Sequence, residues 1–261
     1  MARAAAADRP QEPSRRSSED TARGSLSADF LEAVGQQMGD GPLTAGALAR
    51  AGAQLLPVDA VGISTVAGPL RLPLGGSTAA AEEAEELQTT LGDGPCLAAA
   101  QSKAPCAADL GDLLRRWPLY GEELTRRTPY RSVASVPLPT PDGEIFAALD
   151  LYSEDPRLSG RLDLGLVAAE LAAPMGALLD LCLRPVRNAT SEAVLPEWYV
   201  DATARRLDVS VAMGMVMALH HQPSAAALSL LRGYAYSHDR DLDDVAEDIV
   251  LGRLDVQHLV D

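Results

Sequence analysis

A change of pattern near residues 184–196 restricts what this chain can fold into more than any other feature. Before it, β-branched runs bounded by Gly and Pro alternate with Ala/Leu-rich stretches, which predicts a mixture of strands and helices. After it, apolar residues recur only at helical spacing. The segment itself is rich in Arg, Asn, Ser and Pro, the composition of a linker. The sequence therefore predicts two folded units of different class.

The length of 261 residues fits two units of ordinary domain size. Residues 1–25 show no apolar periodicity and predict a disordered tail. This leaves a first unit over 26–183, a linker over 184–196 and a second unit over 197–261. Because no apolar run approaches the roughly 18–20 residues that span a bilayer, we expect a cytoplasmic protein without membrane contact.

The first unit is predicted to be α+β. Its expected elements are, in order, helix 27–54, strands 58–65 and 70–74, helices 79–87 and 96–102, strands 132–138 and 145–152, and helix 162–183. Strands that follow one another in pairs predict an antiparallel sheet with flanking helices, which leaves a pocket between the sheet and its loops. The four glutamates of the 79–87 helix predict a solvated helix face. They are Glu82, Glu83, Glu85 and Glu86.

The second unit is predicted to be an all-α bundle of three helices. Its first helix carries two apolar stripes. The stripe expected in the core is Val209, Ala212, Val216 and Leu219. The other steps by four and three, as in helix pairing, and consists of Val200, Ala204, Leu207, Val211, Gly214 and Ala218. Pro223 begins the second helix and Asp241 is a good N-cap for the third. So small a core favours a homodimer.

The residue inventory predicts no enzyme, no cofactor and no metal site. The first unit contains no histidine, which excludes a His-ligated haem and Ser-His-Asp or Cys-His catalytic sets within it. The three cysteines, Cys96, Cys106 and Cys182, match neither a disulfide framework nor a zinc site. We expect buried thiols, with a redox pair of Cys96 and Cys106 as the alternative.

Three separated motifs of the first unit resemble those of GAF domains in actinobacterial regulators. They are Leu87 to Cys96 (LQTTLGDGPC), Arg116-Trp117-Pro118 and Ala148 to Tyr152 (ALDLY). The resemblance covers about residues 40–180. It implies a sensor domain whose pocket could hold a small-molecule ligand of unknown identity.

The second unit resembles an ANTAR domain. The motifs are Ala212 to Met217, Ala227 to Arg232 with Tyr234-Ala235, and Leu242 with Asp244-Val245-Ala246 and Ile249-Val250. The resemblance implies a dimeric three-helix module that binds paired hairpin loops in nascent RNA and so acts in transcription antitermination. GAF followed by ANTAR is a common order. This sequence departs from the family at Met213, where Lys or Thr is usual.

RNA loops are recognised by stacking on aromatic or Arg planes and by phosphate contacts. The candidate RNA-binding residues are Arg205, Arg206, Arg232, Tyr236 and Arg240. The alternative for Arg205 and Arg206 is an interchain ion pair with Asp201 or Asp208. The net charge of −15, and the excess of acidic over basic residues after 197, favour a second reading. In that reading the protein is a dimeric protein-interaction scaffold that has lost RNA binding.

Overall fold

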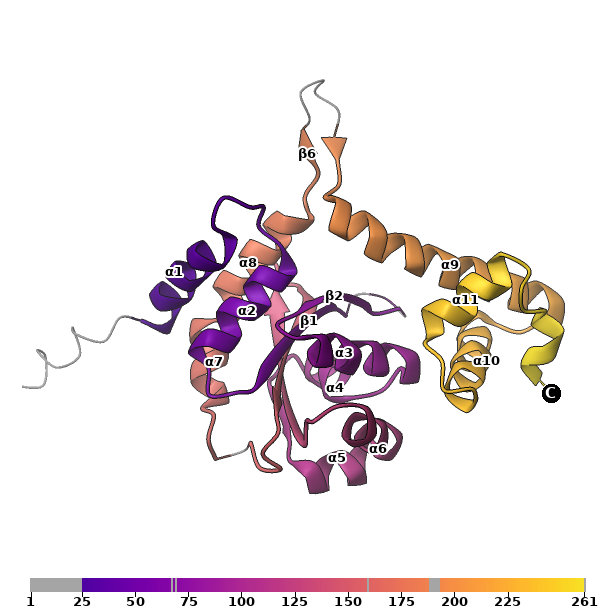
Figure 1. The fold of residues 1–261 in the computed structure, drawn as a ribbon, viewed down its shortest axis with the longest axis horizontal. Helices are drawn as coiled ribbons and strands as arrows, with labels where there is room; N and C mark the ends of the chain where they lie inside the picture. Colours follow the sequence, from indigo (N-terminus) through magenta and orange to yellow (C-terminus); the bar gives the residue numbers. More distant parts are fainter. Residues whose placement is uncertain (1–24, 67, 69, 159, 188–192, 261) are drawn as a thin grey trace, which may run out of the picture.

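A five-stranded antiparallel sheet forms the centre of the first unit in the computed structural model, which describes residues 25–66, 68, 70–158, 160–187 and 193–260 (Figure 1). The strands are β1 (Ala60–Thr65), β2 (Leu72–Gly76), β3 (Cys106–Ala108), β4 (Ser132–Pro139) and β5 (Ile145–Ser153). Their order is β2-β1-β5-β4-β3. The predicted α+β class is confirmed for this sheet unit, whereas the predicted tail lies outside the described residues, except for Ser25.

Helices cover both faces of the sheet (Figure 1). One face packs against α1 (Leu26–Met38), α2 (Ala45–Leu55), α7 (Leu164–Glu170) and α8 (Ala172–Leu183). The other faces α3 (Ala79–Leu91), α4 (Pro95–Ser102), α5 (Leu110–Arg116) and α6 (Pro118–Arg127). Side chains along a strand alternate between these two layers, so β5 sends Leu149 and Leu151 to the first layer and Asp150 and Tyr152 to the second.

Two long helices expected from the sequence are each two helices. The segment 27–54 breaks after Met38, where Gly39 adopts a φ of +51° and Pro42 follows. The segment 162–183 bends by 49° between α7 and α8. The short elements β3, α5 and α6 were not predicted. Among the described residues no single helix is long and apolar enough to cross a membrane, and only the bent α7–α8 pair passes a test of length and composition.

Three helices and a short 3-10 turn build the second unit, as expected. They are α9 (Glu197–His220), α10 (Ser224–Ser237), α11 (Leu242–Val250) and the turn Val256–Val260. This helical unit has its own apolar core, drawn from all of these elements. Within the predicted linker, β6 (Val186–Arg187) and β7 (Ala193–Val194) pair as a two-stranded ribbon.

Helix α9 has one buried face and one exposed apolar face. All six residues of the predicted outer stripe are exposed, from Val200 to Ala218. The predicted core stripe is buried as far as Val216, but Leu219 is 45% exposed, so its assignment was wrong. At this end of α9 the side chain that turns towards the rest of the unit is the half-buried His220. Its Nε2 lies 3.2 Å from the carbonyl oxygen of Val256.

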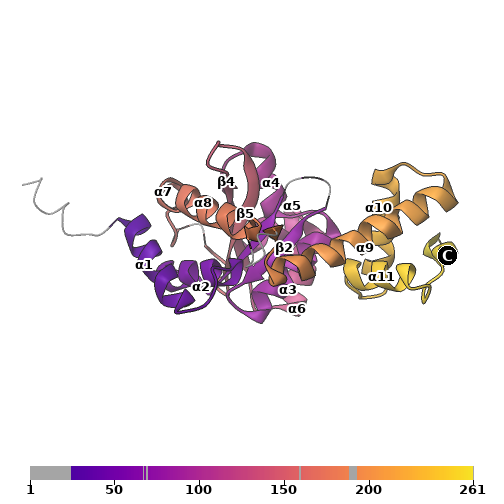
Figure 2. The same cartoon turned by 90° about the horizontal axis from the view of Figure 1, so that it is seen from above.

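Residues of each unit pack on the apolar core of the other. The first turns of α9 pack on the sheet unit, with Ala202 buried in its core and Trp198 and Tyr199 against it. In the opposite direction Leu70, just before β2, packs on the core of the helical unit. Helix α9 therefore runs continuously from one unit to the other (Figure 2).

Candidate functional site

Helix α3 lies between the sheet and the helical unit (Figure 1). Its consecutive residues Glu85 and Glu86 face opposite sides. Glu85 is fully buried against the sheet, whereas Glu86 lies 3.4 Å from a guanidinium nitrogen of Arg206 on α9. The expectation that all four glutamates of α3 form a solvated face was therefore wrong, because the sheet buries Glu85 and the helical unit covers Glu86.

The inner cluster, between α3 and the sheet, is centred on Arg71, which directly precedes β2 and is 2% exposed. Its Nη2 lies 2.8 Å from Glu85 Oε2 and 3.5 Å from Asp150 Oδ2. The Tyr152 hydroxyl donates to Glu85 at 2.6 Å, and the Gln88 amide donates to Asp150 at 2.7 Å. These side chains fill the space between the sheet and α3.

One cation faces two carboxyl groups in this inner cluster. Burial and the negative charge of Glu85 raise the pKa of Asp150 well above its usual value, which favours a protonated Asp150. The hydroxyl of Tyr120 and the Nε and Nη1 atoms of Arg71 are buried without a hydrogen-bond partner among the described residues. In the sequence, Gln88, Asp150 and Tyr152 stand out only as members of separate motifs, and no local pattern joins them to Arg71 and Glu85.

The outer cluster is centred on Arg206, which is 8% exposed. Its Nη1 lies 2.5 Å from Asp243 Oδ1 on α11, and its Nη2 faces Glu86 across the junction. Burial raises the pKa of Glu86 to about 7, although Arg206 acts in the opposite direction. Burial also raises the pKa of Asp243 and of Asp241. Burial therefore disfavours the ionised form of these three carboxyl groups.

Arg232 reaches the same side of α3 from α10. A methyl group at Gly92, the C-cap of α3, would collide with the Arg232 guanidinium, so the two are in close contact. The Nε of Arg232 is buried and has no hydrogen-bond partner in the described part of the chain. Burial and the positive charges of Arg206 and Arg71 lower the pKa of Arg232.

A backbone hydrogen bond joins the units at the start of α11. The amide of Leu242 donates to the Thr90 hydroxyl of α3 at 3.2 Å, and both residues are buried. Asp241 occupies the N-cap position, as predicted, but its side chain makes no capping hydrogen bond. The sheet unit thus satisfies a helix N-terminus of the helical unit, where backbone N–H groups lack partners within their own helix.

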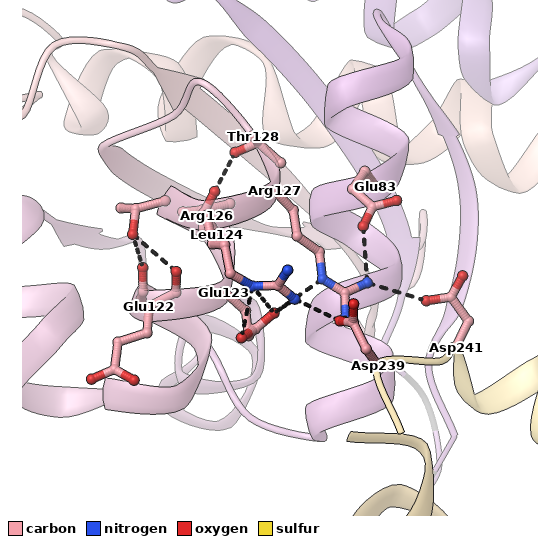
Figure 3. Close-up of polar contacts among 11 residues, drawn as sticks. Glu83, Glu122, Glu123, Leu124, Arg126, Arg127, Thr128, Asp239 and Asp241 are labelled. Atoms are coloured by element: carbon pink, nitrogen blue, oxygen red, sulfur yellow. Dashed lines mark hydrogen bonds and ion pairs between the residues drawn. The ribbon is translucent and has the colours of Figure 1, made fainter. Parts of the chain in front are cut away.

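Two arginines of α6 bind the turn between α10 and α11 (Figure 3). Asp239 Oδ1 lies 2.5 Å from Arg126 Nη2 and 2.7 Å from Arg127 Nη2. Arg127 also pairs with Glu83 of α3 at 3.2 Å and with Glu123 of α6 at 3.0 Å. These ion pairs lower the pKa of Asp239, with the hydrogen bond from Arg126 as the largest cause.

The structure brings together only two of the five predicted RNA-binding residues. Arg206 and Arg232 meet on α3, as described above. Arg205 is exposed on α9 and lines a cavity of about 410 Å³ with glutamates of α3. Tyr236 is exposed at the end of α10. Arg240 pairs with Asp248 of α11 at 2.7 Å.

The three cysteines are free thiols. Cys96 and Cys182 are buried, and Cys106 is half-buried, with its sulfur 3.6 Å from Arg116 Nη2. Burial raises the pKa of Cys96 well above its usual value and that of Cys182 to about 12. Thiolates are the reactive form, so both buried thiols are poor nucleophiles at neutral pH.

Two solved GAF-domain structures resemble part of this chain. The crystal structure of the GAF domain from Acinetobacter phosphoenolpyruvate-protein phosphotransferase covers 61% of this chain and 96% of that chain, with 12% identity and a TM-score of 0.41. A second GAF-domain structure covers 60% of this chain and 93% of that chain, with 15% identity and a TM-score of 0.34. No protein-family model and no curated protein matches the sequence.

Proposed function

We propose that this protein is a signal-responsive regulator of transcription antitermination. The sheet unit acts as a GAF-type sensor, and the helical unit acts as an ANTAR-type module that binds hairpin loops in nascent RNA. The observation that carries the proposal is the meeting of Arg206 and Arg232, from two different helices, on one side of the helical unit.

This arginine pair stands out because the helical unit is acidic overall. Residues 197–261 contain five Arg and eleven Asp or Glu, a balance of 5 − 11 = −6. Two cations kept close together favour an anionic ligand, and a guanidinium can both contact phosphate and stack on a splayed base. The Nε of Arg232 has no hydrogen-bond partner among the described residues, and this buried donor would be available to such a ligand once it is exposed.

The exposed stripe of α9 supports a homodimer. Leu207 is 64% exposed and Val211 is 43% exposed, and both belong to a stripe with the spacing of paired helices. A dimer would present two arginine pairs, which suits two adjacent hairpins. The same stripe and the acidic charge also favour the second candidate, a dimeric protein-interaction scaffold without RNA affinity.

Binding of the full chain to RNA separates these candidates. The probe is an RNA with two adjacent short-loop hairpins, and the control RNA joins the same stems into one continuous duplex. We expect loop-dependent binding that weakens with rising salt and is lost in Arg232→Ala, while Arg253→Ala, which lies in the same unit and pairs with Asp248, retains it. No binding of either RNA by the wild type or by any of the substituted proteins would favour the scaffold, and equal binding of both RNAs would contradict the recognition of loops.

A further inference from the structure

The sheet unit presents a docking face to the helical unit. This docking face consists of Glu83, Glu86, Thr90 and Gly92 of α3 with Arg126 and Arg127 of α6. Three polar features of the facing helical surface have a partner there. Arg206 meets Glu86, the amide of Leu242 meets Thr90, and Asp239 meets the two α6 arginines.

The docking face covers the arginine pair. Arg206 is 8% exposed, and its Nε is buried together with that of Arg232. An RNA phosphate or base cannot reach these atoms while α3 lies over them. Asp243 of the helical unit holds Nη1 of Arg206, and Glu86 places a second carboxylate on Nη2, where a phosphate would compete with it.

We propose that the structure is a closed state, in which the docking face and RNA compete for Arg206 and Arg232. This inference rests on the proposed function. The competitor of RNA is thus a part of the same chain, and RNA binding requires the helical unit to leave α3.

The contacts that hold this state are suited to release. Arg126 is 52% exposed and Asp239 is 66% exposed, so water and salt weaken their ion pair. Ion pairs of this kind are individually weak, and they leave two charged, well-solvated surfaces when they separate. A further factor favours release. In the closed state the Nε of Arg232 is buried without a hydrogen-bond partner among the described residues, which is unfavourable.

The inner cluster is connected to the docking face through two short stretches of chain. Leu70 packs on the helical core while its neighbour Arg71 binds Glu85 and Asp150. Helix α3 carries Glu85 inward and Glu86 outward. Arg71 and Glu85 of the inner cluster are thus the chain neighbours of Leu70 and Glu86, which contact the helical unit.

Two substitutions on the sheet unit test the closed state without altering the helical unit. Arg126→Glu places a carboxylate opposite Asp239, and Gly92→Ala pushes away the flexible end of Arg232. The matched control is Arg115→Glu with Gly143→Ala. Like Arg126, Arg115 pairs with an acidic residue three positions before it. Like Gly92, Gly143 has a positive φ, but a methyl group added at Gly143 would meet open space.

The experiment measures two quantities on the full chain at one pH: the amide hydrogen exchange of the peptide containing Leu242, and the affinity for the two-hairpin RNA. We expect Arg126→Glu/Gly92→Ala to exchange faster and to bind RNA roughly tenfold more tightly, because the competent fraction rises. The control double variant should match the wild type in both. Arg126→Glu alone should shift both quantities in the same direction, so misfolding of the double variant does not decide the result.

The outcomes separate the inference from the proposed function. Faster exchange with unchanged RNA affinity overturns the competition while RNA binding stands. Unchanged exchange in Arg126→Glu overturns the closed state itself. If the opened variant exchanges faster and neither it nor the wild type binds RNA, the proposed function fails and the competition fails with it.

Discussion

Glu85 and Glu86 are neighbours on α3, yet they belong to charged clusters of opposite character. The inner cluster around Arg71 is sealed in the sheet unit, where Arg71, Glu85 and Asp150 are at most 2% exposed. The outer cluster around Arg206 joins two units, and Glu86 there is 20% exposed. Both clusters pair an arginine with two carboxyl groups, so their difference lies in burial and in what each one holds together.

This comparison shows how one helix can combine a fixed and a releasable contact. Separating a fully buried pair leaves an uncompensated charge in the interior, which costs several kcal/mol. Separating a pair at a junction returns both groups to water and costs far less. The inner cluster therefore fixes α3 on the sheet, while the outer cluster lets the helical unit dock and leave.

The largest expected effect comes from breaking the inner cluster. Arg71→Met leaves Glu85 and Asp150 buried without their cation, so the free energy of unfolding should fall by about 3–5 kcal/mol. Chemical denaturation followed by circular dichroism measures this. The control is Arg50→Met, because Arg50 is exposed and should change the value by less than about 0.5 kcal/mol. A loss below about 1 kcal/mol for Arg71→Met would remove the distinction between the clusters.

A second prediction compares the two faces of α9 at positions two residues apart. Val209 is fully buried and Val211 is 43% exposed. Val209→Ala should lower the free energy of unfolding of the helical unit by about 2 kcal/mol, since it removes apolar contact and leaves a cavity. Val211→Ala should cost less than about 0.5 kcal/mol when measured at low concentration by the same denaturation experiment. Similar losses for both would mean that the outer stripe is already packed within one chain.

The outer cluster should respond to pH near neutrality. Glu86 faces Arg205 and Arg206 of α9 and Asp241 and Asp243 of α11, and burial raises its pKa to about 7. A group whose pKa is raised in the closed state stabilises that state below its ordinary pKa and loses this contribution as pH rises through about 7. Between pH 6 and pH 8 the closed state should lose about 1 kcal/mol.

Small-angle X-ray scattering measures this loss as a larger radius of gyration at pH 8 than at pH 6. Glu86→Gln should reduce the change, whereas Glu122→Gln on the exposed side of α6 should not. Expansion towards pH 6 instead would contradict the assignment of Glu86 to the closed contact.

Local structure was predicted well from the sequence where the apolar residues of a segment followed a single pattern, that of a strand or that of a helix. Strands 132–138 and 145–152 were predicted because two short, mostly apolar runs flank a Pro-Asp-Gly turn, and β4 and β5 confirm both. The break after Met38 was missed, although Gly39, Gly41 and Pro42 are the residues that end a helix. The Ala/Leu pattern on both sides of this break outweighed them.

The contact between the units could not be predicted from local pattern, because it joins residues over 100 positions apart. Arg206 was predicted to contact RNA, but it lies in phase with Ala202, Val209 and Ala212 on α9, and that phase was the available signal of its burial. Thr90 and Arg126 carried no such signal. Their roles arise only when α10 and α11 fold against α3.

The most direct test of the competition is the amide exchange of Leu242 in the wild-type protein, measured with and without the two-hairpin RNA. Coupling between two sites is reciprocal, so if the closed contact hinders RNA binding, bound RNA must open the contact. We predict that saturating RNA speeds the exchange of Leu242, because its amide loses the Thr90 hydroxyl. Slower or unchanged exchange in the RNA-bound protein would contradict the account.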